Sequence, residues 1–267
     1  MRLMTPSQRP MFSTAAFFAR PLADTLALVA EAGYRGAEVM VTKDPASQDP
    51  RTIRALAKRF GLDIGAIHAP CLLLTRRVWG TDPVGKIHRA VEVAEEVGAP
   101  IVVVHPPFRW QYPYRRWLEE RLEGFSERTG VELVVENMFP VRVGGRGVTL
   151  HANQDLDELD PFGSLVLDTS HAAVAGHDLI EVRRRFGARM RHVHLSDNAG
   201  KGWDSHLPLG EGVLPIDAFL DELARDGYDG SLTLEVDLRQ YLTDRTRVLD
   251  VMRRDRERCE TRLSQPV

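Results

Sequence analysis

Residues 83–107 read PVGKIHRAVEVAEEVGAPIVVVHPP, and this stretch indicates the fold class. Its first part combines an apolar stripe with a charged face, as in a helix on a protein surface. Gly98 can end that helix in a left-handed conformation. The β-branched run that follows, at about residues 100–105, has the composition of a buried parallel strand and ends on His105. A helix that passes directly into such a strand is the repeating element of an α/β fold.

The same alternation extends through the whole chain. We expect strands, with boundaries accurate to about three residues, at 11–16, 36–41, 62–68, 100–105, 131–136, 164–168, 190–196 and 231–236. Segments with helical periodicity occupy 21–34, 50–61, 83–98, 114–130, 177–187, 215–228 and 237–263. Eight strands separated by helices predict a single-domain (β/α)8 TIM barrel over residues 1–267. A doubly wound sheet would need a glycine-rich phosphate turn after its first strand, and the segment STAAFFARP contains no glycine.

Composition describes an ordinary globular protein. The formal net charge is -3, with 43% hydrophobic and 27% charged residues, so there is no global attraction to polyanions. The two cysteines, Cys71 and Cys259, are too few for a disulfide framework or a multi-cysteine zinc site. We find no apolar stretch that could span a bilayer and no targeting signal, and therefore expect a cytoplasmic protein without a membrane partner.

Acidic and histidine side chains lie at or just beyond the carboxyl ends of the apolar runs. A strand of Ile, Val and Leu has no folding reason to end on an ionisable group, because burying one unpaired costs several kcal/mol. Carboxylates and imidazoles are ligands of divalent metals, and the carboxyl ends of all eight strands of a barrel converge on one face. We therefore predict a shared metal site, whose ligands are His68, His105, Glu136, Asp168, His171, His194, Asp204, His206 and Glu235.

Other polar residues have two interpretations each. His192 lies two residues before His194, on the same face of the strand and one layer deeper, which favours a hydrogen-bonded core or supporting role. In a barrel, Glu38 would point toward the mouth, where it either contacts substrate or is a structural carboxylate. In FRWQYPYRRW (108–117), Arg109 and Trp110 can bind and stack a sugar or a base, or the segment simply begins a helix. We predict Glu38, Arg109 and Trp110 as substrate-binding residues.

Several motifs carry a family resemblance. DTSHAAVAGHDL (168–179) and HLSDNAGKGWDSHLPLGEG (194–212) are similar to signature segments of endonuclease IV. GYRGAEVMV (33–41), GLDIGAIHAP (61–70) and GYDGSLTLEV (227–236) resemble strand motifs of sugar isomerases and epimerases. Over nearly its whole length the chain therefore resembles the xylose isomerase-like TIM barrel superfamily, which contains both groups.

The resemblance to the isomerases implies one metal ion and two catalytic carboxylates. Glu136, Asp168, His194 and Glu235 would hold one Mn, Mg or Co ion. Glu136 and Glu235 would pass a proton between adjacent carbons of the substrate while the metal polarises its carbonyl. In one respect the chain departs from this pattern, because many isomerases have an arginine near the position of His206.

The resemblance to endonuclease IV (AP endonuclease family 2) implies a trinuclear zinc centre. Glu136 would bridge two metals. The other ligands would complete one site with His68 and His105, a second with Asp168, His194 and Glu235, and a third with His171, Asp204 and His206. Adjacent metals can generate a hydroxide and clamp a phosphodiester. Against this function stand the acidic net charge and the lack of a dense Lys/Arg stripe for duplex binding.

We therefore predict a divalent-metal-dependent isomerase or epimerase whose substrate is a small sugar or sugar phosphate. The cofactor is Zn, Mn, Mg or Co, with one ion expected and up to three permitted. The alternative is a zinc-dependent phosphodiesterase of the endonuclease IV type, and only this alternative implies a nucleic acid partner. A barrel that binds a polyol or metal without turnover is the third possibility.

Overall fold

Eight parallel strands pair side by side and close into a barrel in the order β1-β10-β9-β8-β5-β4-β3-β2. The computed structural model describes residues 9–18, 20–70, 75, 77–143 and 146–264. The barrel strands are β1 (Met11–Ser13), β2 (Gly36–Met40), β3 (Asp63–His68), β4 (Ile101–Val104), β5 (Glu132–Glu136), β8 (Leu165–Asp168), β9 (Met190–Leu195) and β10 (Ser231–Leu234). Each corresponds to one predicted strand, and the predicted (β/α)8 TIM barrel is confirmed.

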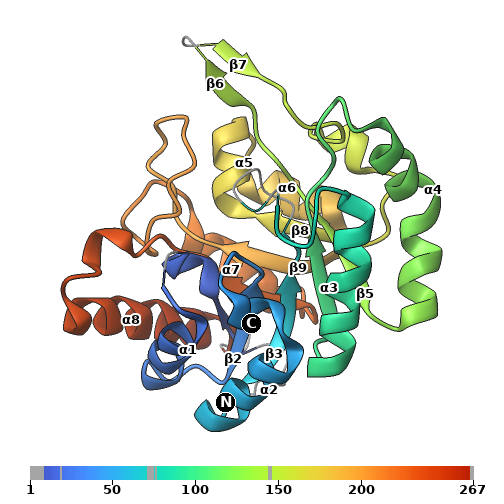
Figure 1. Ribbon diagram of the computed structural model, residues 1–267. Coiled ribbons are helices and arrows are strands. Elements are labelled where there is room, and N and C mark those ends of the chain that lie inside the picture. The colour runs from blue at the N-terminus through green and yellow to red at the C-terminus, as the bar shows by residue number, and fades with distance from the viewer. Residues whose placement is uncertain (1–8, 19, 71–74, 76, 144–145, 265–267) are drawn as a thin grey trace.

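Helices cover the outside of the barrel (Figure 1). They are α1 (Leu22–Glu31), α2 (Pro50–Phe60), α3 (Pro83–Val97), α4 (Tyr112–Thr129), α5 (Thr169–Ala175), α6 (Leu179–Phe186), α7 (Ile216–Arg225) and α8 (Arg245–Leu263). The stretch at 83–107 shows how the local sequence sets these ends. Asp82 accepts backbone hydrogen bonds at the start of α3, and Gly98, with φ 80°, closes its end in the left-handed conformation.

The structure corrects three details of the predicted elements. The first strand ends at Ser13 rather than at residue 16, because the Ser13 hydroxyl caps a 3-10 helix. Helix α5 and an antiparallel hairpin, β6 (Val141–Val143) with β7 (Arg146–Val148), were not predicted. The last helix begins at Arg245 rather than at residue 237. Short 3-10 helices occupy Thr14–Phe17, Pro45–Gln48, Leu156–Leu159, Gly187–Arg189 and Arg239–Tyr241.

The hydrophobic core has two parts. The larger part lies between the strands and the helices, and it includes the fully buried Leu26 and Phe219. The smaller part consists of side chains of β3, β4, β5 and β8 inside the barrel, namely Ala66, Ile101, Val103, Val134 and Val166. Among the described residues, no helix is long and apolar enough to cross a membrane.

Candidate metal centre

The fold brings all nine predicted ligands to the carboxyl ends of the strands. His68, Glu136 and Asp168 are the last residues of β3, β5 and β8, and His194 is the penultimate residue of β9. His105 and Glu235 directly follow β4 and β10, His171 lies in α5, and Asp204 and His206 lie on the loop after β9. Of the nine predicted ligands, Asp204, His206 and Glu235 are half-buried and the others are buried.

Glu136 lies at the centre of the cluster. Its Oε2 is 2.8 Å from His105 Nε2 and 3.4 Å from His68 Nε2. Its Oε1 is 3.1 Å from His194 Nδ1 and 3.5 Å from His171 Nδ1. One carboxylate therefore faces four imidazoles.

His194 connects Glu136 with the other two strand-end carboxylates. Its Nδ1 lies 2.9 Å from Glu235 Oε2 and 3.9 Å from Asp168 Oδ2. Donor atoms of Glu136, Asp168 and His194 lie within 4.8 Å of one another, a spacing that one ion could bridge. The second carboxylate, Glu235, joins this group through its contact with His194.

A third group includes the loop residues Asp204 and His206. Asp204 Oδ2 is 2.8 Å from His206 Nε2 and 3.5 Å from His171 Nε2. Donor atoms of Asp168, His171 and His206 also lie within 4.8 Å of one another. His206 has a φ of +39°, which is uncommon for a residue other than glycine, and its Nδ1 lies 3.0 Å from the Glu235 carbonyl oxygen. Backbone strain of this kind is found where the surrounding structure holds a residue in a functional position.

The donor set fits a divalent metal. Glu136 Oε2, Asp168 Oδ2 and Glu235 Oε2 are buried, yet none of them accepts a well-aligned hydrogen bond from the described residues. Buried carboxylate oxygens in proteins are ordinarily hydrogen-bonded or bound to a cation. Histidine nitrogens and carboxylate oxygens suit zinc and manganese alike, so the donor types leave the metal identity open.

Burial and mutual contacts shift the titration of the cluster. Burial raises the pKa of Asp168 to about 6. Burial would lower the pKa of His171, but Asp168 and Asp204 outweigh it and raise that pKa to about 10. Burial would raise the pKa of Glu136, whereas His194 and His105 hold it well below its ordinary value. Since ligation needs deprotonated donors, a metal entering this cluster displaces protons.

Two residues that sequence reasoning missed support the ligands. Asn137 donates from Nδ2 to the Asp168 carbonyl (3.1 Å) and accepts from the Asp168 N–H (2.7 Å), and its own carbonyl lies 2.8 Å from His171 Nδ1. The buried carboxylate of Asp197 accepts four backbone N–H groups of the loop that carries Asp204 and His206. Their positions, directly after Glu136 and just beyond β9, were the signals that could have identified them.

A cavity of about 300 Å³ adjoins the cluster. Glu235, Asp204 and His206 line it, together with Phe18, Met40 and Arg239. Its volume is at the lower end of the range for small-molecule sites. The sequence did not predict Phe18, Met40 or Arg239 as site residues, because no motif in the sequence identifies them.

The three predicted substrate-binding residues do not line this cavity. Glu38 is fully buried, and its Oε2 lies 2.8 Å from His192 Nε2 and 3.2 Å from His194 Nε2. Arg109 and Trp110 are exposed on the segment after β4, where the Trp110 ring stacks on Phe108 with centroids 4.9 Å apart. A substrate contact by any of the three stays a prediction.

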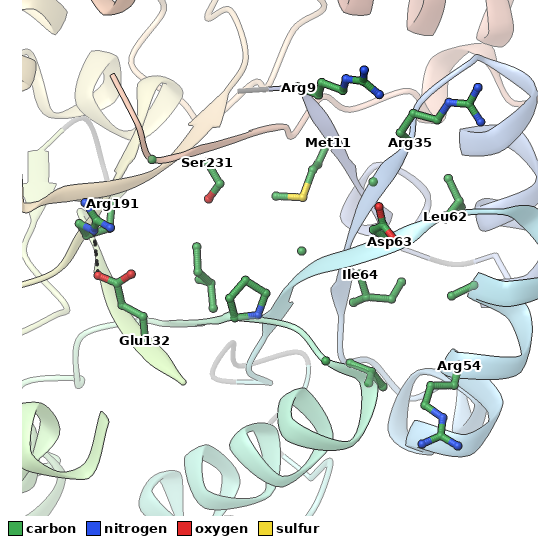
Figure 2. Close-up of a pocket in the computed structure, with 18 of the residues that line it drawn as sticks. Arg9, Met11, Arg35, Arg54, Leu62, Asp63, Ile64, Glu132, Arg191 and Ser231 are labelled. Carbon is green, nitrogen blue, oxygen red and sulfur yellow. Dashed lines mark hydrogen bonds and ion pairs between the residues drawn. The ribbon is translucent and has the colours of Figure 1, made fainter. Parts of the chain in front are cut away.

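A larger cavity, of about 820 Å³, lies at the opposite end of the barrel (Figure 2). Its lining includes Met11, Gly36, Asp63 and Ser231, the first residues of β1, β2, β3 and β10. It contains none of the nine predicted ligands. Active sites of TIM barrels lie at the carboxyl ends of the strands, so the smaller cavity beside Glu235 is the one placed for chemistry.

The sequence profile of the Xylose isomerase-like TIM barrel family matches residues 26–256, and the chain belongs to that family. An uncharacterized protein of Mycobacterium tuberculosis (strain ATCC 25618 / H37Rv) is 38% identical over 253 residues, which cover 88% of this chain and 87% of the relative.

Solved structures show the same barrel. A D-tagatose 3-epimerase-like protein is 22% identical and matches with a TM-score of 0.72 over 96% of this chain and 100% of its own. An L-ribulose 3-epimerase is 20% identical and matches with a TM-score of 0.68 over 96% of this chain and 94% of its own. At these identities the likeness shows the fold.

Proposed function

We propose that this protein is a divalent-metal-dependent isomerase or epimerase of a small sugar or sugar phosphate. One observation carries the proposal. The carboxylates of Glu136 and Glu235 approach the same imidazole nitrogen, Nδ1 of His194, at 3.1 and 2.9 Å, beside a cavity of about 300 Å³. Two carboxylates beside one metal-binding position can remove and return the proton that moves between adjacent carbons.

Four residues would bind the metal, and two of them would also transfer protons. Glu136, Asp168, His194 and Glu235 would hold the metal, which when bound would polarise the substrate carbonyl and acidify the neighbouring C–H. Glu235 lines the cavity and would remove the proton from that carbon. Glu136, which is ionised at rest, would first take up a proton from solvent and would then deliver it to the adjacent carbon or to the opposite face of the same carbon, while Glu235 would release the proton it had removed to solvent. The names of the structural neighbours, a D-tagatose 3-epimerase-like protein and an L-ribulose 3-epimerase, support a small sugar as the substrate.

Solvent exchange tests this proposal. Protein loaded with manganese is incubated in D₂O with D-tagatose or D-fructose, free or phosphorylated, and proton NMR follows the signals next to the carbonyl and any new epimer or isomer. We expect deuterium at that carbon, and we expect Glu235→Gln to slow its incorporation at least about 100-fold while also weakening metal binding. Glu257→Gln, which changes an exposed carboxylate, is the matched control and should behave as wild type. Metal-loaded protein that exchanges no proton of any of these sugars would contradict the proposal.

A second function is favoured by the connection of all nine ligands into one cluster. The groups His68–His105–Glu136 and Asp168–His171–His206 could each hold a further ion. Three zinc ions per chain, together with cleavage of an abasic-site duplex that chelator and His206→Ala abolish, would establish a phosphodiesterase instead. His206→Ala also separates the two roles of this residue. Loss of a ligand lowers the metal stoichiometry, whereas loss of a substrate contact raises KM at unchanged metal content.

A further inference from the structure

A chain of hydrogen bonds runs inside the barrel from the cavity at the amino ends of the strands to the metal centre. Ser231 lines that cavity (Figure 2). Its Oγ lies 2.5 Å from His192 Nδ1. His192 Nε2 lies 2.8 Å from Glu38 Oε2. The same carboxylate faces His194 Nε2, at 3.2 Å from Oε2 and 3.1 Å from Oε1. Glu38, His192 and His194 are fully buried.

We propose that Glu38, supported by His192 and Ser231, is a positioning residue that holds His194 in the tautomer whose Nδ1 binds the metal. The inference rests on the metal site of the proposed function and deepens it. It assigns no contact between Glu38 and the substrate.

The direction of each hydrogen bond follows from the chemistry of the groups. An ionised carboxylate only accepts, so both imidazoles donate their Nε2–H to Glu38. The Nδ1 of a neutral His192 is then left with a lone pair, which accepts the Ser231 O–H. For His194, the same assignment leaves the Nδ1 lone pair directed at Glu136 and Glu235. The opposite tautomer would place a proton at Nδ1 and block the metal.

The composition of the barrel interior points to the same role. Apart from the ligands at the strand ends, the interior side chains of β3, β4, β5 and β8 form an apolar cluster, whereas β2 and β9 place Glu38 and His192 inside the barrel, fully buried. A buried carboxylate with its imidazole partners seldom stabilises a fold more than apolar residues of similar volume would. A carboxylate on the distal nitrogen of a metal-binding histidine has a known benefit, since it fixes the ring and makes the ligand more basic.

Direct ligation is the competing role for Glu38. Donor atoms of Glu38, His68 and His194 lie within 4.8 Å of one another. An ion held there would need the His194 lone pair on Nε2, whereas Glu136, Asp168 and Glu235 face Nδ1. A neutral imidazole offers only one of these lone pairs, and three carboxylates gather at Nδ1.

The first test observes the tautomer of His194 in the wild-type protein, and a variant serves only to assign its signals. Zinc-loaded protein labelled with ¹⁵N-histidine is studied by long-range ¹H–¹⁵N correlation NMR, and the His194 signals are assigned by their loss in His194→Gln. We expect a proton on Nε2, protected from solvent exchange, and a metal-shifted Nδ1. A proton on Nδ1 of His194 would overturn the proposal.

Zinc affinity, measured by calorimetry, then tests Glu38 itself. Glu38→Leu removes the acceptor and should weaken zinc binding about 10- to 100-fold at unchanged stoichiometry. Glu38→Gln keeps an oxygen that can accept from both imidazoles, so it should retain the Nε2–H signal and lose less affinity. Thr233→Val is the matched control. Thr233 is fully buried in β10, the strand beside β9, and its hydroxyl has no hydrogen-bond partner among the described residues. It should bind zinc as wild type does.

The outcomes separate this inference from the proposed function. Zinc binding by Glu38→Leu with wild-type affinity overturns the positioning role alone, and loss of one ion per chain shows that Glu38 is a ligand instead. Wild-type protein that binds no divalent metal overturns both proposals. If the tautomer and the zinc affinities are as expected but no sugar exchanges a proton, the positioning role of Glu38 stands and only the proposed isomerase function is wrong.

Discussion

Replacing Asp197 with alanine should destabilise the loop that carries Asp204 and His206. The Asp197 carboxylate accepts the backbone N–H groups of Asn198 (2.8 Å) and Leu214 (2.9 Å) on Oδ1. On Oδ2 it accepts those of Gly210 (3.0 Å) and Gly212 (3.1 Å), and the side chain is 1% exposed. One carboxylate thus joins the two ends of the loop.

The magnitude follows from these four bonds. A hydrogen bond to a charged group contributes about 1.5–3 kcal/mol, so full loss of four would exceed about 6 kcal/mol. Gly210 is exposed and Gly212 is half-buried, so water can replace part of what is lost. We therefore expect Asp197→Ala to lower the free energy of unfolding by about 3–5 kcal/mol. Asp197→Asn keeps one acceptor oxygen and should lose about half as much.

Urea unfolding at pH 7 in the presence of EDTA measures this effect without a contribution from bound metal. Asp229→Ala is the control, because the Asp229 side chain is 83% exposed and its ion pair with Arg191 is 3.6 Å long. It should change the stability by less than about 1 kcal/mol. Limited proteolysis should cut Asp197→Ala within residues 198–214 before wild type. If Asp197→Ala unfolds at the wild-type urea midpoint, the carboxylate does not hold the loop together.

Three further predictions concern the rest of the fold. Burial raises the pKa of Asp255 from 3.8 to about 6, so between those pH values the folded state retains a proton that the unfolded state has lost. The free energy of unfolding therefore falls as the pH rises through this window. In urea titrations from pH 4 to 8, wild type should lose about 2–3 kcal/mol relative to Asp255→Asn. A Cβ on residue 65 would lie 2.1 Å from Sδ of Met11, the flexible end of a side chain that lines the same cavity of about 820 Å³ and can move into it. Gly65→Ala should therefore destabilise by less than about 1 kcal/mol in thermal unfolding, and a larger loss would show that Met11 cannot move. Cys259 is fully buried and burial raises its pKa, so in a Cys71→Ser background its thiol should react with Ellman's reagent only on unfolding, and rapid reaction of the native protein would contradict that placement.

Strand positions were predictable because one physical rule governs them. A parallel strand buried on both faces is mostly apolar, and a short β-branched run such as the one before His105 favours a strand over a helix. Elements held by tertiary contacts left no such pattern. Helix α5 begins where Asp168 accepts the His171 N–H, a bond between two candidate ligands, so its existence depends on the site rather than on helical periodicity. Cys71, for its part, lies outside the described residues.

The candidate ligands were predictable for a related reason. Burial makes an ionisable residue at a strand end conspicuous, and all nine residues selected in that way lie in one cluster. Their supporting residues were harder to identify. Asn137 acts partly through its backbone carbonyl, and Arg239 reaches the cavity from a 3-10 helix without a motif. Sequence reasoning identified His192 as a hydrogen-bonded residue beneath His194, but its link to Glu38 crosses 154 positions and becomes visible only in the closed barrel.

The barrel interior divides into an apolar side and a polar side, and this division bears on how the site could change. Val103 and Val134 represent the apolar side, and Glu38 and His192 represent the polar one. Because buried ionisable groups are costly unless they are paired, the stability of the fold must come mainly from the outer layer between strands and helices, where Leu26 and Phe219 are fully buried. Changes at the strand ends therefore alter the chemistry without removing the packing that holds the barrel closed. The functional difference between a sugar isomerase and a phosphodiesterase on this fold then reduces to which of the clustered donors bind metal and what the adjoining cavity admits.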